Sequence, residues 1–374
     1  MKTIPFSSPD IQDSDLKAVE SVIRSGWLAH GEYSKKLEQL FCEYTGAKYA
    51  STVSNCTAGL HLSCLAAGFG PEDEVIVPAQ THTATAHAVE FTDAKVVFAD
   101  VDPLSGNILI EALEEKYTEK TKGVIPVHMA GHPCAMKEIS EFCEVKNLIL
   151  IEDCAHAIGT IAQGMHAGNF GITGCFSFYP TKQITTGEGG IVISNDEQII
   201  EKVKKLKAFG IDTPPELRTK PGVYDVLSLG YNYRMTDFQA ALGVGQMERY
   251  EENVAGRRKN AKLYCELLKN RDDISFSKYS DNNSYFLFQI IFEQSINRDK
   301  ILLGLKENGI GVSIHYATPV PLMSYYKKKY GYQISDFPNS VSYGSQSLSL
   351  PVHAMLSDDD VKYVCNTLIK ILED

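Results

Sequence analysis

The sequence lacks any apolar run close to the roughly 18 residues that a membrane-spanning helix needs. Its first residues, MKTIPFSSPDIQDSD, contain one lysine followed by polar and acidic residues, and so lack the apolar core of a secretory signal. Both absences argue against a membrane protein and against export. We therefore expect a cytoplasmic protein without a membrane partner.

Positive charge is also scarce. The 374 residues include 36 Lys and Arg against 47 Asp and Glu, which gives a formal net charge of -11. The summed field of such a chain repels polyanions, so we expect no nucleic-acid partner. An anionic small molecule can still bind, but only at a local site.

Motifs for metals, phosphates and dinucleotides are missing. Nine cysteines occur without a C-x-x-C pair, and neither H-E-x-x-H nor G-x-x-x-x-G-K-[ST] occurs. Gly68 and Gly70 do not complete a dinucleotide fingerprint, because Asp73 stands where its third glycine belongs. We therefore expect reduced cysteines, no metal site and no Rossmann-type nucleotide site.

The sequence does have an ordinary globular composition, with 44% hydrophobic and 22% charged residues, in a chain longer than one core usually serves. A leading helix is predicted over residues 14–25, and a long amphipathic helix from about Asp237 through Ala261. We place the domain boundary along the second helix. Residues 1–250 then form a large domain, and residues 251–374 form a smaller C-terminal α/β domain.

Short apolar runs rich in β-branched residues alternate with helical stretches. Runs that are apolar almost throughout are typical of strands buried on both faces of a mainly parallel sheet, so we predict an α/β fold with helices on both sides. Ligands of such sheets bind at the carboxyl ends of the strands, which draws attention to His128, Asp153 and the segment after Tyr179. The runs are EVIVPA (74–79), KVVFADVD (95–102), GVIPVHM (123–129), NLILIEDC (147–154) and CFSFYP (175–180).

Lys182 occupies an unusual place, in a short loop between one such run and a Thr/Gly-rich turn that leads into a second strand: CFSFYPTKQITTGEGGIVISN. An amine held against a buried sheet is desolvated, which favours its neutral, nucleophilic form. On spacing alone, a surface lysine on a hairpin-like turn is the commoner arrangement.

The segment FSFYPTKQITTGEGG resembles the lysine segment of the DegT-type sugar aminotransferases, which are fold-type-I pyridoxal phosphate (PLP) enzymes. The resemblance extends along nearly the whole chain. It implies a three-layer large domain like that of aspartate aminotransferase, with Lys182 carrying PLP as a Schiff base. Further matching segments are SGWLAHGEYSKKLEQLF (25–41), SNCTAGLHL (54–62), IEDCAHAIG (151–159), GYNYRMTDFQAALGVGQM (230–247) and the SLSLPVH tail.

Three residues are carried over to the ring of the cofactor. The resemblance places the Asp153 carboxylate at the pyridine nitrogen, which it keeps protonated. His156 resembles the residue near the 3-oxygen of the cofactor. His82 stands where relatives usually have an aromatic residue stacked on the ring, and an imidazole offers less stacking area. Without the resemblance, a cap or turn residue would describe Asp153 equally well, and a buried core residue would describe His156 better.

Other residues are carried over to the phosphate. Cys56, through its backbone, and Thr57 begin a helix whose free N–H groups suit an anion, although many relatives have glycine at the Cys56 position. Ser177 resembles a further phosphate contact. Asn232 resembles a residue that reaches the cofactor of a neighbouring subunit, which implies a homodimer with shared active sites. As local features, these are also common helix caps and turn residues.

Glu188, His315 and Tyr316 resemble residues at the substrate mouth. The resemblance implies two half-reactions: L-glutamate converts PLP to pyridoxamine phosphate, which then aminates a nucleotide-diphosphate-linked keto sugar, by family frequency a 4-keto-6-deoxy sugar. The product would serve polysaccharide, glycan or antibiotic sugar synthesis.

Two other functions stay open at this point. Some relatives dehydrate the sugar instead; the 3-dehydratases have histidine at the Lys182 position, and others use an iron–sulfur cluster, for which the scattered cysteines are poorly placed. A PLP-binding regulator of the same fold would keep the site without the chemistry.

Overall fold

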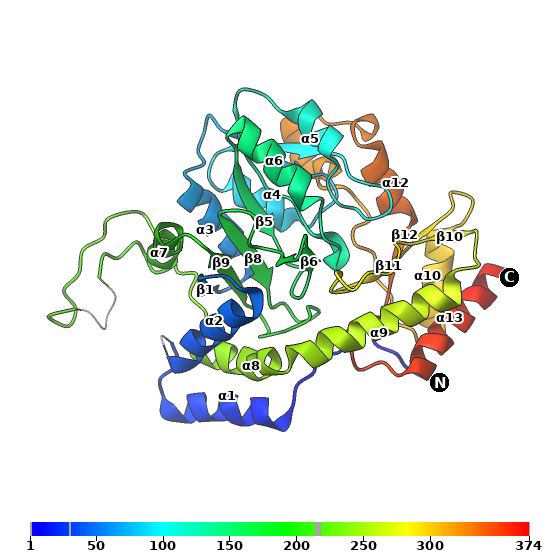
Figure 1. Ribbon diagram of the computed structural model, residues 1–374, viewed down its shortest axis with the longest axis horizontal. Helices are drawn as coiled ribbons and strands as arrows, with labels where there is room; N and C mark the ends of the chain where they lie inside the picture. Colours follow the sequence, from blue (N-terminus) through cyan, green and yellow to red (C-terminus); the bar gives the residue numbers. More distant parts are fainter. Residues whose placement is uncertain (1, 30, 214–217, 374) are drawn as a thin grey trace.

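The computed structural model describes residues 2–29, 31–213 and 218–373, and its centre is a seven-stranded sheet (Figure 1). The strand order is β1-β9-β8-β5-β4-β2-β3, in which neighbours from β8 to β3 are parallel and β9 is antiparallel to both of its neighbours. The predicted mainly parallel sheet is confirmed. The bounds are β1 (Tyr49–Val53), β2 (Glu74–Pro78), β3 (Lys95–Ala99), β4 (Thr121–Val124), β5 (Ile149–Asp153), β8 (Thr173–Ser177) and β9 (Gly190–Ser194).

Each predicted apolar run contains a strand, but the run over 123–129 was expected to be extended for longer than it is. Strand β4 ends at Val124, two residues before Pro126, which has no N–H to donate to a neighbouring strand. The backbone then leaves the sheet and forms a single 3₁₀ turn at Met129–Gly131.

Helices cover both faces of the sheet. Alternate residues of a strand point to opposite faces, and because both sets are apolar here, each face needs its own layer of helices. In β2, Val75 and Val77 pack into one core with α3, whereas Ile76 packs into another with α5 and α6. The predicted three-layer architecture is therefore confirmed. The helices of this unit are α2 (Glu32–Thr45), α3 (Cys56–Ala67), α4 (Thr83–Glu90), α5 (Ile110–Lys116), α6 (Met136–Lys146) and α7 (Glu197–Leu206).

The long helix predicted from Asp237 through Ala261 is wrong as one element. The chain forms α8 (Asp237–Glu248) and α9 (Tyr250–Leu268), separated by a non-helical backbone at Arg249. The guanidinium group of Arg249 binds Asp15, Asp10 and the carbonyl of Gly245, so the break coincides with a residue fixed by the N-terminal segment.

The residues after α8 contribute a second core around a three-stranded antiparallel sheet. Helix α9 spans both cores, with Val254 in the core beneath α2 and α8 and Tyr264 in the second one. Ile4 also lies in the second core. The boundary between residues 250 and 251 stays a prediction. The elements of this core are β10 (Ile274–Ser275), β11 (Phe288–Phe292), β12 (Ser347–Leu350), α10 (Arg298–Glu307) and α13 (Asp358–Glu373). Two further helices of this part of the chain are α11 (Ser324–Tyr330), whose Tyr326 packs into the core that contains α3, and α12 (Pro338–Gln346).

The leading helix α1 (Asp13–Ser25) forms nearly as predicted and packs on α8 (Figure 1). Its apolar stripe is not fully covered, however: Val22 is buried, whereas Leu16 and Ile23 are 58% and 57% exposed. The periodicity identified the apolar face of the helix but not what covers it.

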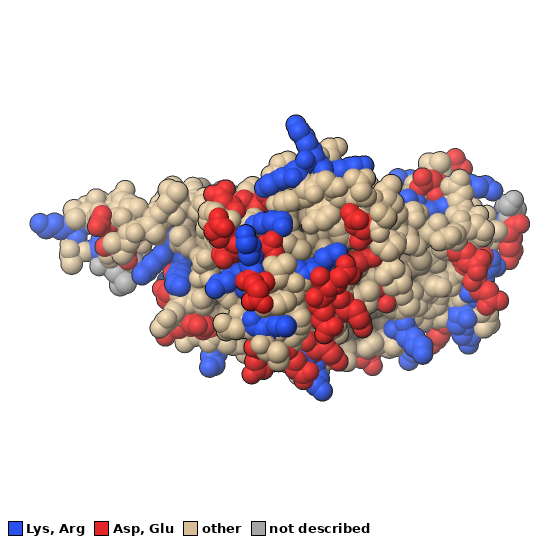
Figure 2. Space-filling view, turned by 90° about the horizontal axis from the view of Figure 1, so that it is seen from above, with Lys and Arg blue, Asp and Glu red and all other residues tan. Residues whose placement is uncertain are grey.

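The surface agrees with the acidic composition. On the face shown in Figure 2, acidic side chains gather in a broad patch, and basic ones are scattered among them. Among the described helices, none is long and apolar enough to cross a membrane.

Candidate active site

A cavity of about 680 Å³ opens at the carboxyl ends of the parallel strands and brings together segments far apart in the sequence. Its walls come from the start of α3, the start of α4, the end of β5 and the loop between β8 and β9. All predicted site residues except Asn232 line it: Cys56, Thr57, His82, Asp153, His156, Ser177, Lys182, Glu188, His315 and Tyr316.

Lys182 lies in a tight turn, in which its N–H donates to the carbonyl of Tyr179 at 2.9 Å. The side chain faces the cavity, and its Nζ lies 4.3 Å from the ring centre of Phe286. Burial lowers the pKa of Lys182 to about 8, although Cys56 and Asp153 partly oppose this shift. The surface-turn interpretation does not fit, because the amine is desolvated and its neutral fraction at physiological pH is much larger than that of an exposed lysine.

This lowered pKa predicts how the bare protein captures PLP. Only the neutral amine is nucleophilic, and its fraction increases as the pH rises through about 8. The rate of covalent attachment, followed by borohydride trapping, should therefore rise from pH 7 and level off above about pH 9. Free Nα-acetyllysine, which keeps its side-chain amine, is the control, and its rate should keep rising above pH 9. A protein rate that also climbs steadily to pH 10 would contradict the desolvated lysine.

Asp153 ends β5 and is 3% exposed. Its Oδ2 accepts a hydrogen bond from Thr85 Oγ1 at 2.7 Å, and its Oδ1 accepts the N–H of Ala155 at 3.0 Å. Burial raises its pKa, whereas these two donors and Lys182 favour the ionised form. A carboxylate held by donors in a desolvated site fits a cationic ring nitrogen, which would balance its charge.

His156 is oriented by contacts on both sides of its ring. Its Nδ1 accepts the N–H of Ala130 at 3.3 Å, and the ring stacks on Phe286 with centroids 4.3 Å apart. Burial, and the positive charge of Lys182, hold its pKa well below the ordinary value. The neutral imidazole therefore carries its proton on Nε2, which lies 3.4 Å from the hydroxyl of Tyr316 and can donate to an oxygen.

The start of α3 fits a phosphate group. Asn55 caps the helix by accepting the N–H of Ala58 at 2.8 Å, while the N–H groups of Cys56 and Thr57 belong to the first turn and have no intrahelical acceptor. Strand β9 approaches closely, because a Cβ on Gly190 would lie 2.8 Å from the Cys56 nitrogen. Ser177, at the end of β8, lines the same part of the cavity.

His82 is the N-cap of α4, where its Nδ1 accepts the N–H of Ala84 at 3.2 Å. Its ring meets Tyr316 edge to face, with centroids 5.7 Å apart. The stacking of His82 on the cofactor ring stays a prediction, as do the substrate contacts of Glu188, His315 and Tyr316.

Several residues of the site had no signal in the sequence. Thr85 binds Asp153, and Phe286 contacts both Lys182 and His156. Phe6 stacks on His315, with ring centroids 5.6 Å apart, and Ser7 donates to the carbonyl of Thr181. No local pattern marks these residues, since each acts through a contact with a distant segment.

Asn232 does not line the cavity of its own chain. It is exposed and accepts a hydrogen bond from Arg234 Nε at 2.9 Å. It follows a segment that extends away from the body of the molecule beyond α7 (Figure 1). That segment exposes large apolar side chains, with Leu229 84% and Leu227 68% exposed.

The chain is similar to known proteins along nearly its whole length. Residues 9–369 match the DegT/DnrJ/EryC1/StrS aminotransferase family. The uncharacterized protein MJ1066 of Methanocaldococcus jannaschii is 38% identical, over 99% of this chain and 98% of that protein. GDP-perosamine synthase of Escherichia coli O157:H7 is 33% identical over the whole of both chains.

Solved structures with the same fold include a sugar aminotransferase and a dehydratase. The sugar aminotransferase Spr1654 of Streptococcus pneumoniae, described as putative and solved in PMP and PLP forms, has a TM-score of 0.91 and 28% identity; its PMP form aligns over 99% of each chain. A mutant of GDP-4-keto-6-deoxymannose-3-dehydratase (ColD) with bound GDP-perosamine has a TM-score of 0.91 and 26% identity, over 97% of this chain and 99% of that one.

The family match covers nearly the whole chain, and the cavity presents a desolvated lysine, a buried carboxylate and a helix start suited to phosphate. The chain therefore belongs to the DegT/DnrJ/EryC1/StrS aminotransferase family and is a PLP-dependent sugar aminotransferase.

Proposed function

We propose that the protein transfers the amino group of L-glutamate to a nucleotide-diphosphate-linked keto sugar, with a 4-keto-6-deoxy hexose as the preferred acceptor. The main support is the arrangement of Lys182 and Asp153, a desolvated amine and a buried carboxylate that face one cavity. The GDP-perosamine synthases among the relatives support a nucleotide-linked sugar as the acceptor.

Each residue of the cavity has a separate role in this proposal. Lys182 would anchor the cofactor; its freed Nζ then takes the α-proton of the amino donor and later returns a proton to the sugar carbon. Asp153 would keep the ring nitrogen protonated, and Nε2 of His156 would donate to the 3-oxygen. Cys56 N–H, Thr57 and Ser177 would hold the phosphate. When bound, PLP supplies an electron-accepting ring.

One experiment distinguishes amino transfer from dehydration of the sugar. The cofactor-loaded protein is incubated with L-glutamate and a panel of nucleotide-linked keto sugars, and the products are weighed by mass spectrometry. Amino sugar and 2-oxoglutarate in equal amounts are expected. A deoxy keto sugar without nitrogen would instead show a dehydratase, the activity for which the ColD neighbour is named. Lys182 argues against this outcome, because the 3-dehydratases among the relatives have histidine at that position.

A non-catalytic regulator is tested by glutamate alone. Transfer requires that glutamate change the visible absorbance of the bound cofactor, and a spectrum unchanged at saturating glutamate would favour the regulator. The presence of Lys182, Asp153 and a helix start suited to phosphate in one cavity supports an enzyme. A cytoplasmic location, the absence of a nucleic-acid partner and the absence of a membrane partner stay predictions.

We also propose a homodimer in which Asn232 reaches the phosphate in the partner's cavity. Three features support it: Asn232 is exposed and away from its own cavity, the preceding segment exposes Leu227 and Leu229, and α1 leaves Leu16 uncovered. Large apolar side chains left exposed in a contiguous patch are typical of an interface between subunits, and Leu227 and Leu229 are exposed in the same segment.

Mixing two inactive variants tests the shared site. Lys182→Ala and Asn232→Ala homodimers should each have low activity. A heterodimer has one site with both substitutions and one with neither, so random reassociation should restore about a quarter of wild-type activity. Mixing each variant with itself is the control. No recovery, although mass spectrometry shows that heterodimers have formed, would place Asn232 outside the partner's site.

A further inference from the structure

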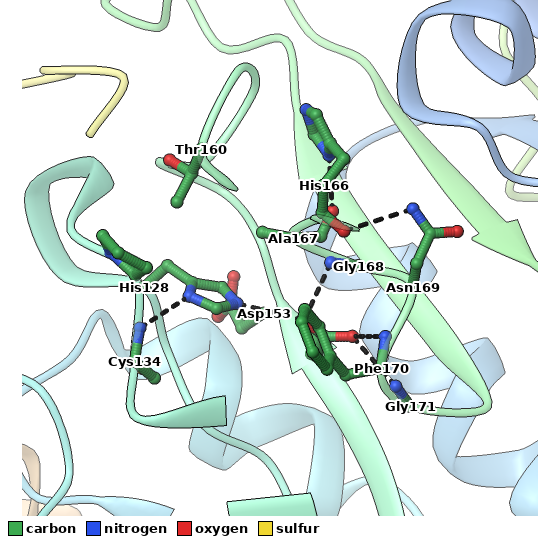
Figure 3. A network of polar contacts seen from close by, with 12 residues as sticks. His128, Cys134, Asp153, Thr160, His166, Ala167, Gly168, Asn169, Phe170 and Gly171 are labelled. Atoms are coloured by element: carbon green, nitrogen blue, oxygen red, sulfur yellow. Dashed lines mark hydrogen bonds and ion pairs between the residues drawn. The ribbon is translucent and has the colours of Figure 1, made fainter. Parts of the chain in front are cut away.

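Behind Asp153, a second carboxylate lies on the opposite side of β5. Glu152 is adjacent in the strand, so its side chain points away from the cavity, and it is fully buried, like His128 beside it. Figure 3 shows His128 next to Cys134, with the loop Gly168–Gly171 folded toward the same place.

The carboxylate of Glu152 has a complete set of donors. Oε1 accepts the N–H groups of Phe170 and Gly171 at 2.7 and 2.9 Å, and Oε2 accepts the N–H of Gly168 at 2.8 Å and Nε2 of His128 at 3.1 Å. Two donors to each oxygen fix the position of the carboxylate inside the protein. No mechanistic step proposed above uses this group.

A metal ion is a poor explanation for the cluster, although ligand atoms of His128, Glu152 and Cys154 lie within 4.8 Å of one another. A cation would have to displace donors from Glu152. It would also face the hydrogen of His128 Nε2, because Nδ1 of that ring accepts the N–H of Cys134 at 3.1 Å.

The same cluster fixes the backbone on each side of Asp153. The N–H of Asp153 donates to Pro126 at 3.0 Å, and its carbonyl accepts the N–H of His128 at 3.4 Å. Glu152 also binds the loop that leads into β8, through the N–H of Gly171. Strand β8 in turn accepts the N–H of Cys154 at the carbonyl of Cys175, at 2.8 Å. Three segments therefore meet at one carboxylate directly behind the cavity.

We propose that Glu152 and His128 are positioning residues that hold the Asp153 carboxylate at the ring nitrogen of the cofactor. The inference rests on the proposed role of Asp153. Moving the end of β5 would change the distance between Asp153 and the ring, and that distance sets how strongly the carboxylate favours a protonated nitrogen.

The test compares Glu152→Gln with Asp100→Asn in the cofactor-loaded protein. Asp100 is a matched control, since it also accepts backbone N–H groups, from Asn339 and Ser340, but does not line the cavity. Both variants should lower the Tm. Glu152→Gln alone should weaken PLP binding by about tenfold or more and shift the pH midpoint of the cofactor absorbance. A lowered Tm with PLP affinity and midpoint within about twofold and 0.2 pH units of wild type would overturn the proposal.

A second pair of variants covers the case in which Glu152→Gln does not fold. His128→Gln can still donate to Glu152, whereas His128→Asn reaches only toward Cys134, so the asparagine variant should lose more PLP affinity; equal affinities would contradict the proposal. Asp153→Asn separates the two claims. If it leaves the midpoint unchanged, the role of Asp153 itself is wrong. If it moves the midpoint and neither Glu152→Gln nor His128→Asn does, the positioning role alone fails.

Discussion

Lys182→Ala should abolish amino transfer, with kcat reduced by about 10⁴-fold or more. The substitution removes the covalent anchor and the group that moves the proton, and acid–base catalysis alone contributes up to about that factor. The nearby His156 is unsuited as a substitute base, because its Nε2 carries the proton while Nδ1 is bound to the Ala130 N–H. PLP should still bind, noncovalently, through the phosphate and ring contacts.

Turnover and covalent labelling measure this effect together. Borohydride should fix PLP to the peptide that contains position 182 in the wild type, and to no peptide in the variant. Lys207→Met is the matched control: Lys207 is also a lysine whose pKa burial lowers, but its Nζ donates to the carbonyl of Thr52 at 2.7 Å and does not line the cavity. It should keep both labelling and turnover. Substantial transfer by Lys182→Ala would refute the assignment.

The sequence was sufficient to predict the sheet because a strand that is buried on both faces is apolar at consecutive positions. Strands such as β2 and β5 are apolar at consecutive positions, since Val75 and Ile76 enter different cores. The carboxyl ends of those strands then identified Asp153. Strand β1 left a weaker trace, because its residues YASTV include two polar positions, Ser51 and Thr52, both of which the structure buries.

The remaining features depend on contacts between distant segments, which a local pattern does not record. Nothing around Phe6 indicates that it stacks on His315, and nothing around Thr85 indicates a bond to Asp153. The break at Arg249 has the same origin, because its partners Asp10 and Asp15 lie near the start of the chain. The roles carried over by resemblance named the residues of the cavity but not the groups that orient them.

Asp153→Asn should reduce kcat by about 10²- to 10³-fold while leaving PLP attached to Lys182. The amide has nearly the same shape and can still accept from Thr85 Oγ1, but it lacks the charge that favours a protonated ring nitrogen. A pre-positioned charge or dipole at a reacting group is worth about 3 to 4 kcal/mol in comparable sites, which corresponds to this loss.

A second substitution, at Thr85, separates the effect of the Asp153 charge from the effect of the hydrogen bond that supports it. Thr85→Val removes one donor, at 2.7 Å, and keeps the carboxylate, so it should cost about tenfold in kcat and raise the pKa of Asp153 further, since that donor now favours the ionised form. Activity of the Thr85→Val protein should consequently fail at a higher pH than that of the wild type as the solution is acidified. The pH profile of kcat measures this. An Asp153→Asn protein with near wild-type kcat, or a Thr85→Val profile displaced toward lower pH, would show that the carboxylate does not act through its charge.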